Sequence, residues 1–219
     1  MSIMRNANIM LHEQIVTRLQ KLGKYKTSDI DVIAKEYLRA SVDVSELLPY
    51  IKESGAVHRI YFYVSLKKIK VYQEQIAFIE RHSTYLNDWW HVDILPQLLV
   101  KAPSFEYVFD KAAEYVKSPL LFVRRWGYVI FLGGHRKDAK HTEKILSFFH
   151  NDEGYYVQMA EAWLLADLAI YNPQAVLKFI KSKNLRYDII GKGIQKMCDS
   201  FRIADDIKNQ AKKLRLLYK

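Results

Sequence analysis

An aromatic and acidic stretch near the middle of the chain, Asn87–Asp93, has the residue types needed for chemistry on a cation. It contains two adjacent tryptophans, and Asp93 follows Trp89 by four residues. In a helix, this spacing places both side chains on one face, one turn apart. The face of an indole ring and a carboxylate both stabilise a positive charge that develops beside them. The alternative is structural: Trp89 anchors the core, and Asp93 is a solvated or capping residue.

Two adjacent arginines, Arg124 and Arg125, lie inside an otherwise apolar segment. Burial of an unpaired guanidinium is costly, so at least one of them must meet an anion or reach a groove. A phosphate matches the planar fork of arginine, and a carboxylate from a neighbouring repeat matches it as well. The local residues leave these two interpretations open.

A third segment, Tyr155–Trp163, begins with an aromatic pair and ends with a tryptophan. Trp163 follows the small Ala162 and can stand clear of the core to touch a ligand, whereas core packing is the more common use of such a residue. The seven histidines show no pair at metal-ligand spacing, and there is no Cys-x-x-Cys or glycine-rich phosphate loop. We therefore expect neither a metal nor a cofactor.

The elements that must position these residues are helices, because apolar residues recur at helical spacing and period-2 alternation is absent. Candidate inner helices begin near Val57, Asp88, Pro119, Tyr155 and Arg186, in steps of 31, 31, 36 and 31 residues. That spacing is close to the period of two-helix solenoid units, which stack because each alone cannot bury its apolar face. We predict an all-α fold, a right-handed HEAT-like helical repeat solenoid. A compact, non-repeating helical bundle is the alternative.

Three local expectations bear on the site. Residues Leu120–Leu132 should form one helix ended by Gly133 and Gly134, and Lys137–Phe149 should form another short helix. Pro96 lies three residues after Asp93. Its ring should bend that helix, because it clashes with the carbonyl group four residues earlier, that of Val92.

The composition bounds the class of protein. Half of the 219 residues are hydrophobic, glycine and proline are scarce, and no linker interrupts the chain, so we expect a single domain over residues 1–219. The formal charge of +10 favours an acidic partner, nucleic acid before an anionic membrane. Residues 181–219 carry 11 Lys and Arg against 4 Asp and Glu, a net charge of +7.

Targeting signals and disulfides are not expected. Cys198 is the single cysteine, so no disulfide can form within the chain, which fits a reducing compartment. The N-terminus lacks the apolar run of a signal peptide, and the longest apolar run, Trp126–Leu132, is too short to span a bilayer. We expect a soluble, cytoplasmic protein that is a monomer and does not bind membranes.

Four stretches of this chain, in order and spacing, resemble the AlkD family of bacterial DNA alkylation-repair proteins, which are HEAT-like solenoids. Trp89–Asp93 resembles the family's Trp-x-x-Val-Asp, and the arginine pair resembles its double arginine. Tyr155–Trp163, followed at the family's spacing by Asn172 and Pro173, resembles its aromatic helix. Ser200–Arg202 resembles its Ser-x-Arg. The resemblance covers roughly residues 22–215.

The resemblance implies a monofunctional DNA glycosylase for cationic N-alkylated purines, such as 3-methyladenine and 7-methylguanine, in double-stranded DNA. The family acts without flipping the base, because an alkylated purine is already a good leaving group. Trp89 and Trp163 would flank the deoxyribose, and Asp93 would stabilise the cationic sugar and orient water. The DNA-binding residues would be Arg124, Arg125, Tyr155 and Tyr156, with Arg125 holding a phosphate.

The chain departs from the family pattern at several positions. Met159 stands where the family has lysine, and Ala166 stands where it usually has arginine. The family's N-terminal motif survives only as Leu22 and Gly23. These departures support a second hypothesis, a non-catalytic or activity-altered HEAT-like paralogue that binds nucleic acid or a protein partner.

Overall fold

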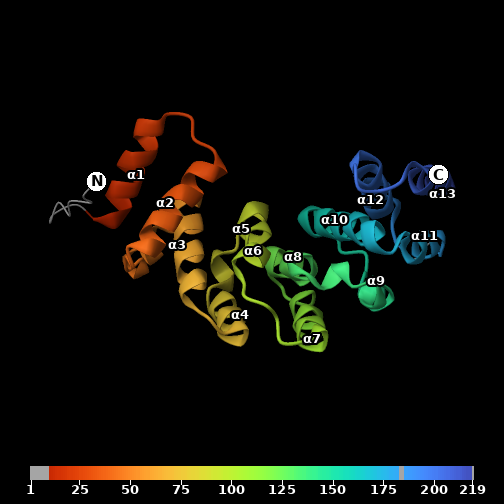
Figure 1. The fold of residues 1–219 in the computed structure, drawn as a ribbon, viewed down its shortest axis with the longest axis horizontal. Coiled ribbons are helices and arrows are strands. Elements are labelled where there is room, and N and C mark those ends of the chain that lie inside the picture. Colours follow the sequence, from red (N-terminus) through yellow and green to blue (C-terminus); the bar gives the residue numbers. More distant parts are fainter. Residues whose placement is uncertain (1–9, 183–184, 219) are drawn as a thin grey trace. The chain divides into compact units, whose positions relative to one another are not determined.

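Helices make up all the regular secondary structure that the computed structural model describes, which is residues 10–182 and 185–218 (Figure 1). No strand occurs in these ranges, so the predicted all-α class is confirmed. Apolar residues from Ile9 to Leu22 recur at helical spacing and predict a first helix; Ile9 lies outside the described residues, and the helix begins at Leu11. The chain divides into two compact units, and Leu86–Gln97 belong with the C-terminal one.

The N-terminal unit runs as far as Tyr85 and includes Leu98–Val100. Its elements are α1 (Leu11–Leu22), α2 (Thr27–Arg39), η1 (Ser45–Tyr50), α3 (Gly55–Lys68), α4 (Tyr72–Arg81) and η2 (Ser83–Tyr85).

Helix α3 is the buried helix of this unit and packs along α2 (Figure 1). The Ser54 hydroxyl oxygen accepts a hydrogen bond from the Val57 amide at the start of α3. Arg59 is buried, and its Nε donates to Asp31 Oδ1 on α2 at 2.6 Å. The charge of this guanidinium is therefore balanced inside the unit.

The C-terminal unit contains every residue that we predicted to act in a site. Its elements are α5 (Trp89–Asp93), α6 (Leu95–Leu98, the last residue of which falls in the other unit), α7 (Phe105–Tyr115), α8 (Leu121–Val129), η3 (Ile130–Gly133), η4 (His135–Lys137), η5 (Ala139–His141), α9 (Thr142–Leu146), α10 (Tyr155–Tyr171), α11 (Pro173–Lys181), α12 (Tyr187–Asp199) and α13 (Asp205–Leu216).

Helix α10 is the centre of this unit, because it packs against α8 on one side and α12 on the other (Figure 1). Most of its residues are buried. The approach of α12 is close: a Cβ atom added at Gly193 would lie 2.8 Å from Leu165 Cδ2. A helix enclosed in this way holds its exposed first turn in a fixed place.

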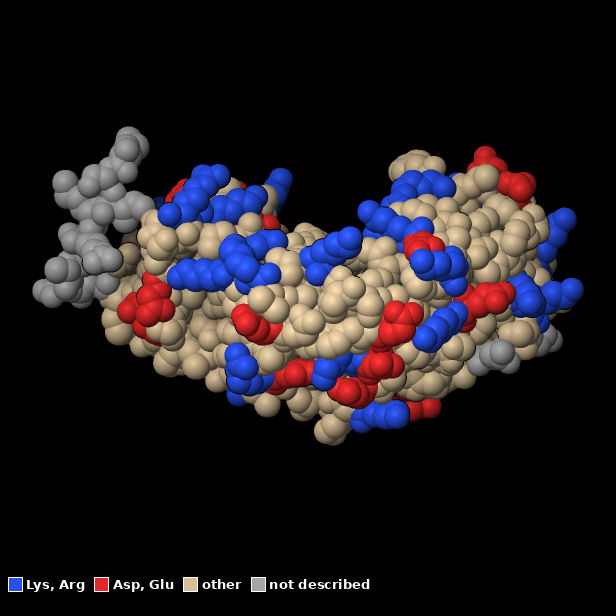
Figure 2. All heavy atoms as spheres, turned by 60° about the horizontal axis from the view of Figure 1, so that its bottom comes forward, with Lys and Arg blue, Asp and Glu red and all other residues tan. Residues whose placement is uncertain are grey.

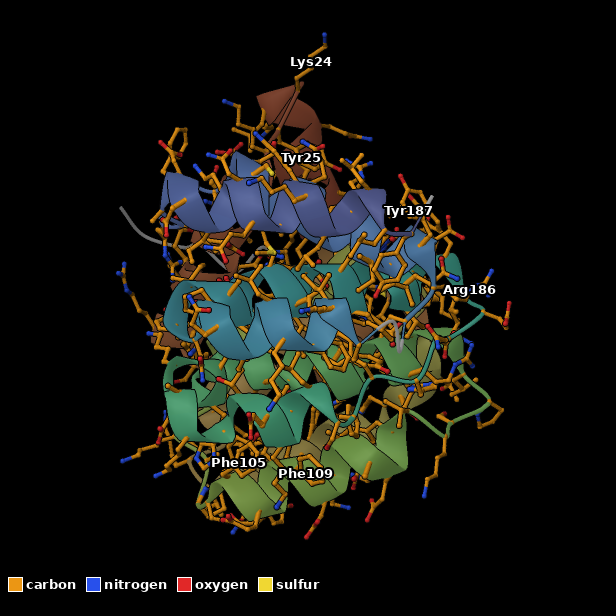
Figure 3. All side chains as sticks on the ribbon, turned by 90° about the vertical axis from the view of Figure 1, so that its right-hand side faces the viewer. Lys24, Tyr25, Phe105, Phe109, Arg186 and Tyr187 are labelled. Carbon is orange, nitrogen blue, oxygen red and sulfur yellow. The ribbon has the colours of Figure 1, made fainter. Side chains whose placement is uncertain are left out.

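A satellite aromatic cluster lies on α7 (Figure 3). The His141 ring stacks on Phe105 with centroids 3.7 Å apart, and Lys144 Nζ lies 4.6 Å from the centre of the Phe109 ring. Arg186 and Tyr187, at the start of α12, lie well apart from this cluster. The cluster therefore serves the packing of α7 and α9.

The predicted helix starts are close to those in the structure. The candidate inner helices begin at Gly55, Trp89, Leu121, Tyr155 and Tyr187, each within two residues of the prediction. The Asn172 side chain accepts from the Ala175 amide, and Pro173 occupies the first helical position of α11.

Two local expectations were wrong and one was confirmed. The helix expected over Lys137–Phe149 is broken into η4, η5 and α9, because the Asp138 carboxylate accepts from the Lys140 amide and starts a new turn. The helix expected over Leu120–Leu132 turns into a 3-10 helix after Val129. The bend expected from Pro96 takes the form of an interruption, because the α-helix stops at Asp93 and restarts at Leu95.

No helix in the described part of the chain has the length and apolar character needed to cross a membrane. Charged side chains of both signs are interspersed on the visible face of the C-terminal unit (Figure 2). On this part of the face, the Lys and Arg side chains do not form a patch free of Asp and Glu.

Candidate active site

The short helix α5 carries the predicted Trp89 and Asp93, one at each end. Asp88 caps the helix, because its Oδ1 accepts from the Trp89 amide at 2.6 Å. The Trp89 side chain is 48% exposed, whereas Trp126 on α8 is buried in the core. The structure therefore does not place Trp89 as a core anchor, and its ring is available to a ligand.

Asp93 forms a bidentate ion pair with Arg125 of α8. Arg125 Nε lies 2.9 Å from Oδ1, and Nη2 lies 2.9 Å from Oδ2. The Arg125 side chain is 5% exposed and that of Asp93 is 19% exposed. The pair thus joins α5 to α8, with the guanidinium inside and the carboxylate at the solvent boundary.

The protonation of Asp93 is set by opposing influences. Burial raises the pKa of Asp93 above its ordinary value, and the charge and hydrogen bonds of Arg125 oppose the rise. Lys196, exposed on α12, opposes it as well. A carboxylate that is ionised with little solvation stabilises a nearby cation more strongly than a hydrated one.

Arg125 also ties this ion pair to the start of α10, where its Nη1 donates to the backbone carbonyl of Tyr156. The Tyr155 and Tyr156 rings are exposed at this helix start. Lys192 Nζ of α12 lies 4.4 Å from the centre of the Tyr155 ring. Aromatic rings and a cation therefore stand beside the residue whose carbonyl holds Arg125.

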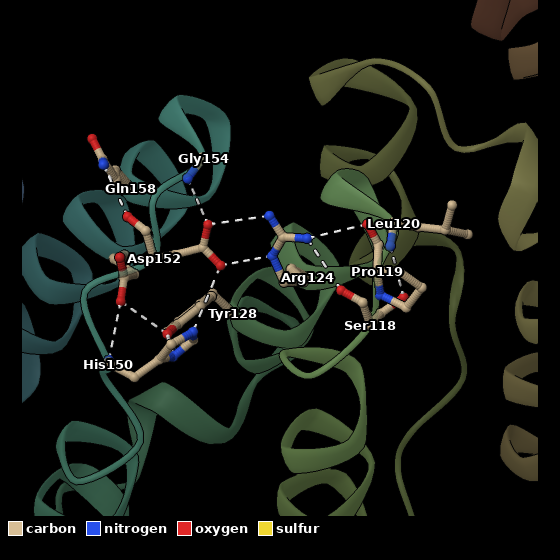
Figure 4. A network of polar contacts seen from close by, with 10 residues as sticks. Ser118, Pro119, Leu120, Arg124, Tyr128, His150, Asp152, Gly154 and Gln158 are labelled. Atoms are coloured by element: carbon tan, nitrogen blue, oxygen red, sulfur yellow. Dashed lines mark hydrogen bonds and ion pairs between the residues drawn. The ribbon is translucent and has the colours of Figure 1, made fainter.

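Arg124 points the other way and pairs with Asp152, in the turn before α10 (Figure 4). Its Nε lies 2.7 Å from Asp152 Oδ2, and its Nη2 lies 3.3 Å from Oδ1. Its Nη1 donates to the carbonyls of Ser118 and Pro119. Both arginines are thus paired with carboxylates, as one of the two interpretations of the sequence proposed.

The phosphate contact predicted for Arg124 and Arg125 stays a prediction, and the hydrogen bonds that these side chains already make limit it. All three nitrogens of each guanidinium already donate to oxygen atoms of the protein. A guanidinium has five N–H groups, so each side chain keeps at least one that these bonds do not use, and a phosphate oxygen would have to reach it although the side chain is 21% exposed in Arg124 and 5% exposed in Arg125.

Trp163 is half-buried on α10, two helical turns after Tyr156 and on the same face. Within the described ranges, no hydrogen bond or ring contact joins it to Trp89, Asp93 or Arg125. The structure brings together Asp93, Arg125 and the start of α10, and it leaves Trp163 further along that helix.

A buried polar cluster lies beneath the Arg124–Asp152 pair (Figure 4). Glu161 is fully buried on α10, and its Oε1 accepts from the Tyr128 hydroxyl at 2.9 Å and from the His150 amide at 3.3 Å. Burial raises the pKa of Glu161 to about 7, although the hydrogen bonds from Tyr128 and His150 oppose the rise. Burial and the Glu161 charge also raise the pKa of Tyr128.

Several of these residues were missed from the sequence. In the sequence, Asn151 and Asp152 indicate only a turn, and Glu161 sits among apolar neighbours with no local signal. Lys192 and Lys196 had a usable signal, because their i,i+4 spacing places both on one face of α12. In the part of the chain that the structure describes, no group of three or more His, Cys, Asp or Glu side chains is placed to hold a metal ion.

The fold and the site define a class of all-helical proteins with a partly buried carboxylate one helical turn from an exposed tryptophan. A family model described as "DNA alkylation repair enzyme" matches residues 22–194. The chain therefore belongs to the DNA alkylation repair enzyme family, which gives it a role in DNA alkylation repair. No individual curated protein and no solved structure matches it.

Proposed function

We propose that this chain is a DNA glycosylase that releases cationic N-alkylated purines, such as 3-methyladenine and 7-methylguanine, from double-stranded DNA. The observation that carries the proposal is the placement of Asp93. Its carboxylate is partly buried, oriented by Arg125 and one helical turn from the exposed Trp89 ring. This arrangement is suited to a sugar that becomes cationic as its glycosidic bond breaks.

In the proposed reaction, the bond between C1′ of the deoxyribose and the alkylated purine nitrogen breaks, and its electron pair leaves with the base. The purine is cationic before cleavage and leaves neutral, so it needs no general acid. The Asp93 carboxylate stabilises the positive sugar, and the Trp89 ring faces it with its electron-rich side. Water then adds to C1′ and loses its proton, which yields an abasic site. Binding the lesion without flipping fits this chemistry, because no catalytic group needs to reach the base.

Binding to DNA in this proposal uses cations and rings at the start of α10 and along α12. Lys192 and Lys196 are the cations of α12 nearest to Tyr155 and Asp93 in the interactions described above. Arg125 acts first as the residue that orients Asp93, and a direct phosphate contact by Arg124 or Arg125 is a further part of the proposal. Trp163 would meet the deoxyribose from α10.

The finer description of the fold is also a proposal. We infer a right-handed HEAT-like solenoid, supported by five helix starts at near-regular intervals along the chain, at Gly55, Trp89, Leu121, Tyr155 and Tyr187. We also propose that the protein acts as a monomer in the cytoplasm.

A second function, binding of nucleic acid without catalysis, is favoured by one observation. Both oxygens of Asp93 accept from Arg125, so the carboxylate charge is already balanced in the free protein. The loss of basic residues at Met159 and Ala166 points the same way. In that case the paralogue keeps the scaffold and binds DNA, or a protein partner, without releasing a base.

The test is single-turnover release of 7-methylguanine from a methylated DNA duplex. We expect release by the wild-type protein, and little or none by Asp93→Asn, which keeps the shape and removes the charge. Binding of the duplex should survive in the variant. Absence of release by wild-type protein that binds the duplex would replace the glycosylase by the non-catalytic binding function.

A further inference from the structure

We propose that Asp152 is a positioning residue for the candidate active site, although it lies outside that site. It fixes the first turn of α10, and through the Tyr156 carbonyl it fixes Arg125 and thus Asp93. The catalytic part of this inference rests on the proposed glycosylase function, whereas the positioning of Arg125 does not.

Asp152 accepts hydrogen bonds from residues outside its own turn as well as from within it (Figure 4). Its side chain is 5% exposed and receives Arg124 Nε at 2.7 Å and the Gly154 amide at 2.7 Å. Its backbone carbonyl accepts from Gln158 Nε2 at 2.9 Å. His150 Nε2 lies 3.6 Å from Oδ2. Donors from α8, from the turn and from the second turn of α10 thus converge on a single residue.

The effect of this convergence reaches the active site through two adjacent arginines. Arg124 and Arg125 follow each other on α8, and their side chains leave the helix in different directions. Arg124 holds the turn that starts α10, and Arg125 donates to the Tyr156 carbonyl in the first turn of the same helix while it pairs with Asp93. A shift of this helix start against α8 must therefore move an acceptor of Arg125.

The close packing of the same turn leaves little room for such a shift in the native protein. A Cβ atom added at Gly154 would lie 2.3 Å from Leu121 Cδ1 and 3.0 Å from Asp152 Oδ1. Glycine at this position lets the backbone amide approach the carboxylate and lets α8 approach the turn. The hydrogen bonds and the packing together fix one position for the start of α10.

The test compares Asp152→Asn with Asp205→Asn in the full-length, ¹⁵N-labelled protein. Asp205 is a matched control, since it is an exposed aspartate of the same unit that pairs with a lysine. The first measurement is the ¹H–¹⁵N signal of Arg125 Nε, identified by its disappearance in Arg125→Lys. We expect Asp152→Asn to shift this signal and to speed its exchange with water, although Asp152 does not contact Arg125. Asp205→Asn should leave it unchanged.

The second measurement is single-turnover release of 7-methylguanine from a duplex of known sequence. We expect the rate to fall by roughly tenfold to a hundredfold in Asp152→Asn, because misplacement of a catalytic group by about 1 Å has effects of that size. The dissociation constant of the duplex should change less than the rate. If Asp152→Asn does not fold, Arg124→Lys serves instead, because it keeps the charge and loses the planar fork.

The outcomes separate this inference from the proposed function. An Arg125 signal that stays unchanged while the Arg124 signal moves would overturn the positioning role, whatever the activity. An equal loss of rate in the two aspartate variants would overturn it as well. A wild-type protein that releases no base contradicts the glycosylase proposal only, because the Arg125 signal still reports whether Asp152 acts at a distance.

Discussion

The adjacent arginines of α8 each pair with an aspartate from another part of the chain, and the two aspartates differ in their burial, in their hydrogen-bond donors and in the direction of their pKa shifts. The Asp152 side chain is less accessible to solvent than that of Asp93, but Asp93 lies deeper among the protein atoms. Arg124 and the Gly154 amide outweigh the effect of burial on Asp152 and hold its pKa below the ordinary value. For Asp93, burial outweighs Arg125 and raises the pKa. Two features differ: Asp93 lies deeper among protein atoms, and among the described residues it accepts hydrogen bonds from Arg125 alone.

This difference separates a structural carboxylate from a reactive one. A carboxylate that already accepts from several N–H groups gains little from a further positive charge. Asp93 stays partly exposed to solvent, one helical turn from the exposed Trp89, and a sugar cation would add to an incompletely satisfied group. The same pair of residue types therefore builds a helix start at one position and a candidate catalytic group at the other.

The largest expected effect comes from removing the two charges in turn. Asp93→Asn should lower the single-turnover rate on the order of a hundredfold or more, because it removes a charge that acts mainly in the transition state. Asp152→Asn should lower it less, because it acts through Arg125. Measured with the same methylated duplex, a greater loss in Asp152→Asn than in Asp93→Asn would reverse the roles that we assign to the two aspartates.

The next effect concerns Glu161, a third carboxylate, whose hydrogen-bond partners among the described residues are the Tyr128 hydroxyl and the His150 amide and include no cation. Its pKa rises from the ordinary 4.5 to about 7 in the folded protein. The folded state therefore binds this proton more tightly than the unfolded chain does. The stability that this tighter proton binding gives the folded protein is fully present below about pH 4.5 and is lost as the pH rises to about 7. The difference corresponds to about 3 kcal/mol of stability.

Glu161→Gln should remove this dependence, because a neutral amide can still accept from Tyr128. Urea unfolding between pH 5 and pH 8 measures it. We expect the variant to be more stable than the wild-type protein at pH 8 and similar to it at pH 5. A variant whose stability falls between pH 5 and pH 8 as steeply as that of the wild type would place the responsible proton on another group.

These three carboxylates show which parts of the site could be predicted from the sequence and which could not. The spacing of Trp89 and Asp93 was sufficient to place them on one helix, because i,i+4 geometry is local. The partners of Arg124 and Arg125 were not predictable, because each lies about 30 residues away in the chain and either a phosphate or a carboxylate would satisfy a guanidinium. Glu161 gave no signal, because its burial depends on α8 and the His150 turn closing over it.

The positions at which helices break were likewise predictable only where the cause is local in the sequence. Pro96 predicted a bend close to where α5 ends, since its clash with the Val92 carbonyl is local. The breaks between Lys137 and Phe149 were missed, because a weak apolar pattern also fits short turns, one of which, η5, is capped by Asp138. Helix starts were therefore more predictable than helix continuity.

A smaller effect is expected from Trp89, which separates chemistry from packing. Trp89→Ala should slow base release by roughly two- to thirtyfold, since a ring contributes about 0.5–2 kcal/mol to a nearby cation. It should cost much less stability than Trp126→Ala, for which about 3–5 kcal/mol is expected from a buried tryptophan. Thermal unfolding and single-turnover release of both variants measure this. A Trp89→Ala protein as unstable as Trp126→Ala would make Trp89 a packing residue.

The smallest effect tests whether the arginines or the lysines meet the phosphates. Binding through phosphates should weaken with salt, with a slope of about −0.9 in log K against log salt for each phosphate neutralised. Lys192→Gln and Lys196→Gln should each reduce the magnitude of this slope by about 0.9 if they contact a phosphate. Arg124→Gln should leave the slope nearly unchanged, because its guanidinium is occupied by Asp152 and two carbonyls in the free protein.

Titration of an unmodified duplex at several salt concentrations gives these slopes without any catalysis. A slope that falls with Arg124→Gln and not with the lysine variants would show that DNA draws Arg124 away from Asp152, so that the structural pair would also be the one that binds DNA.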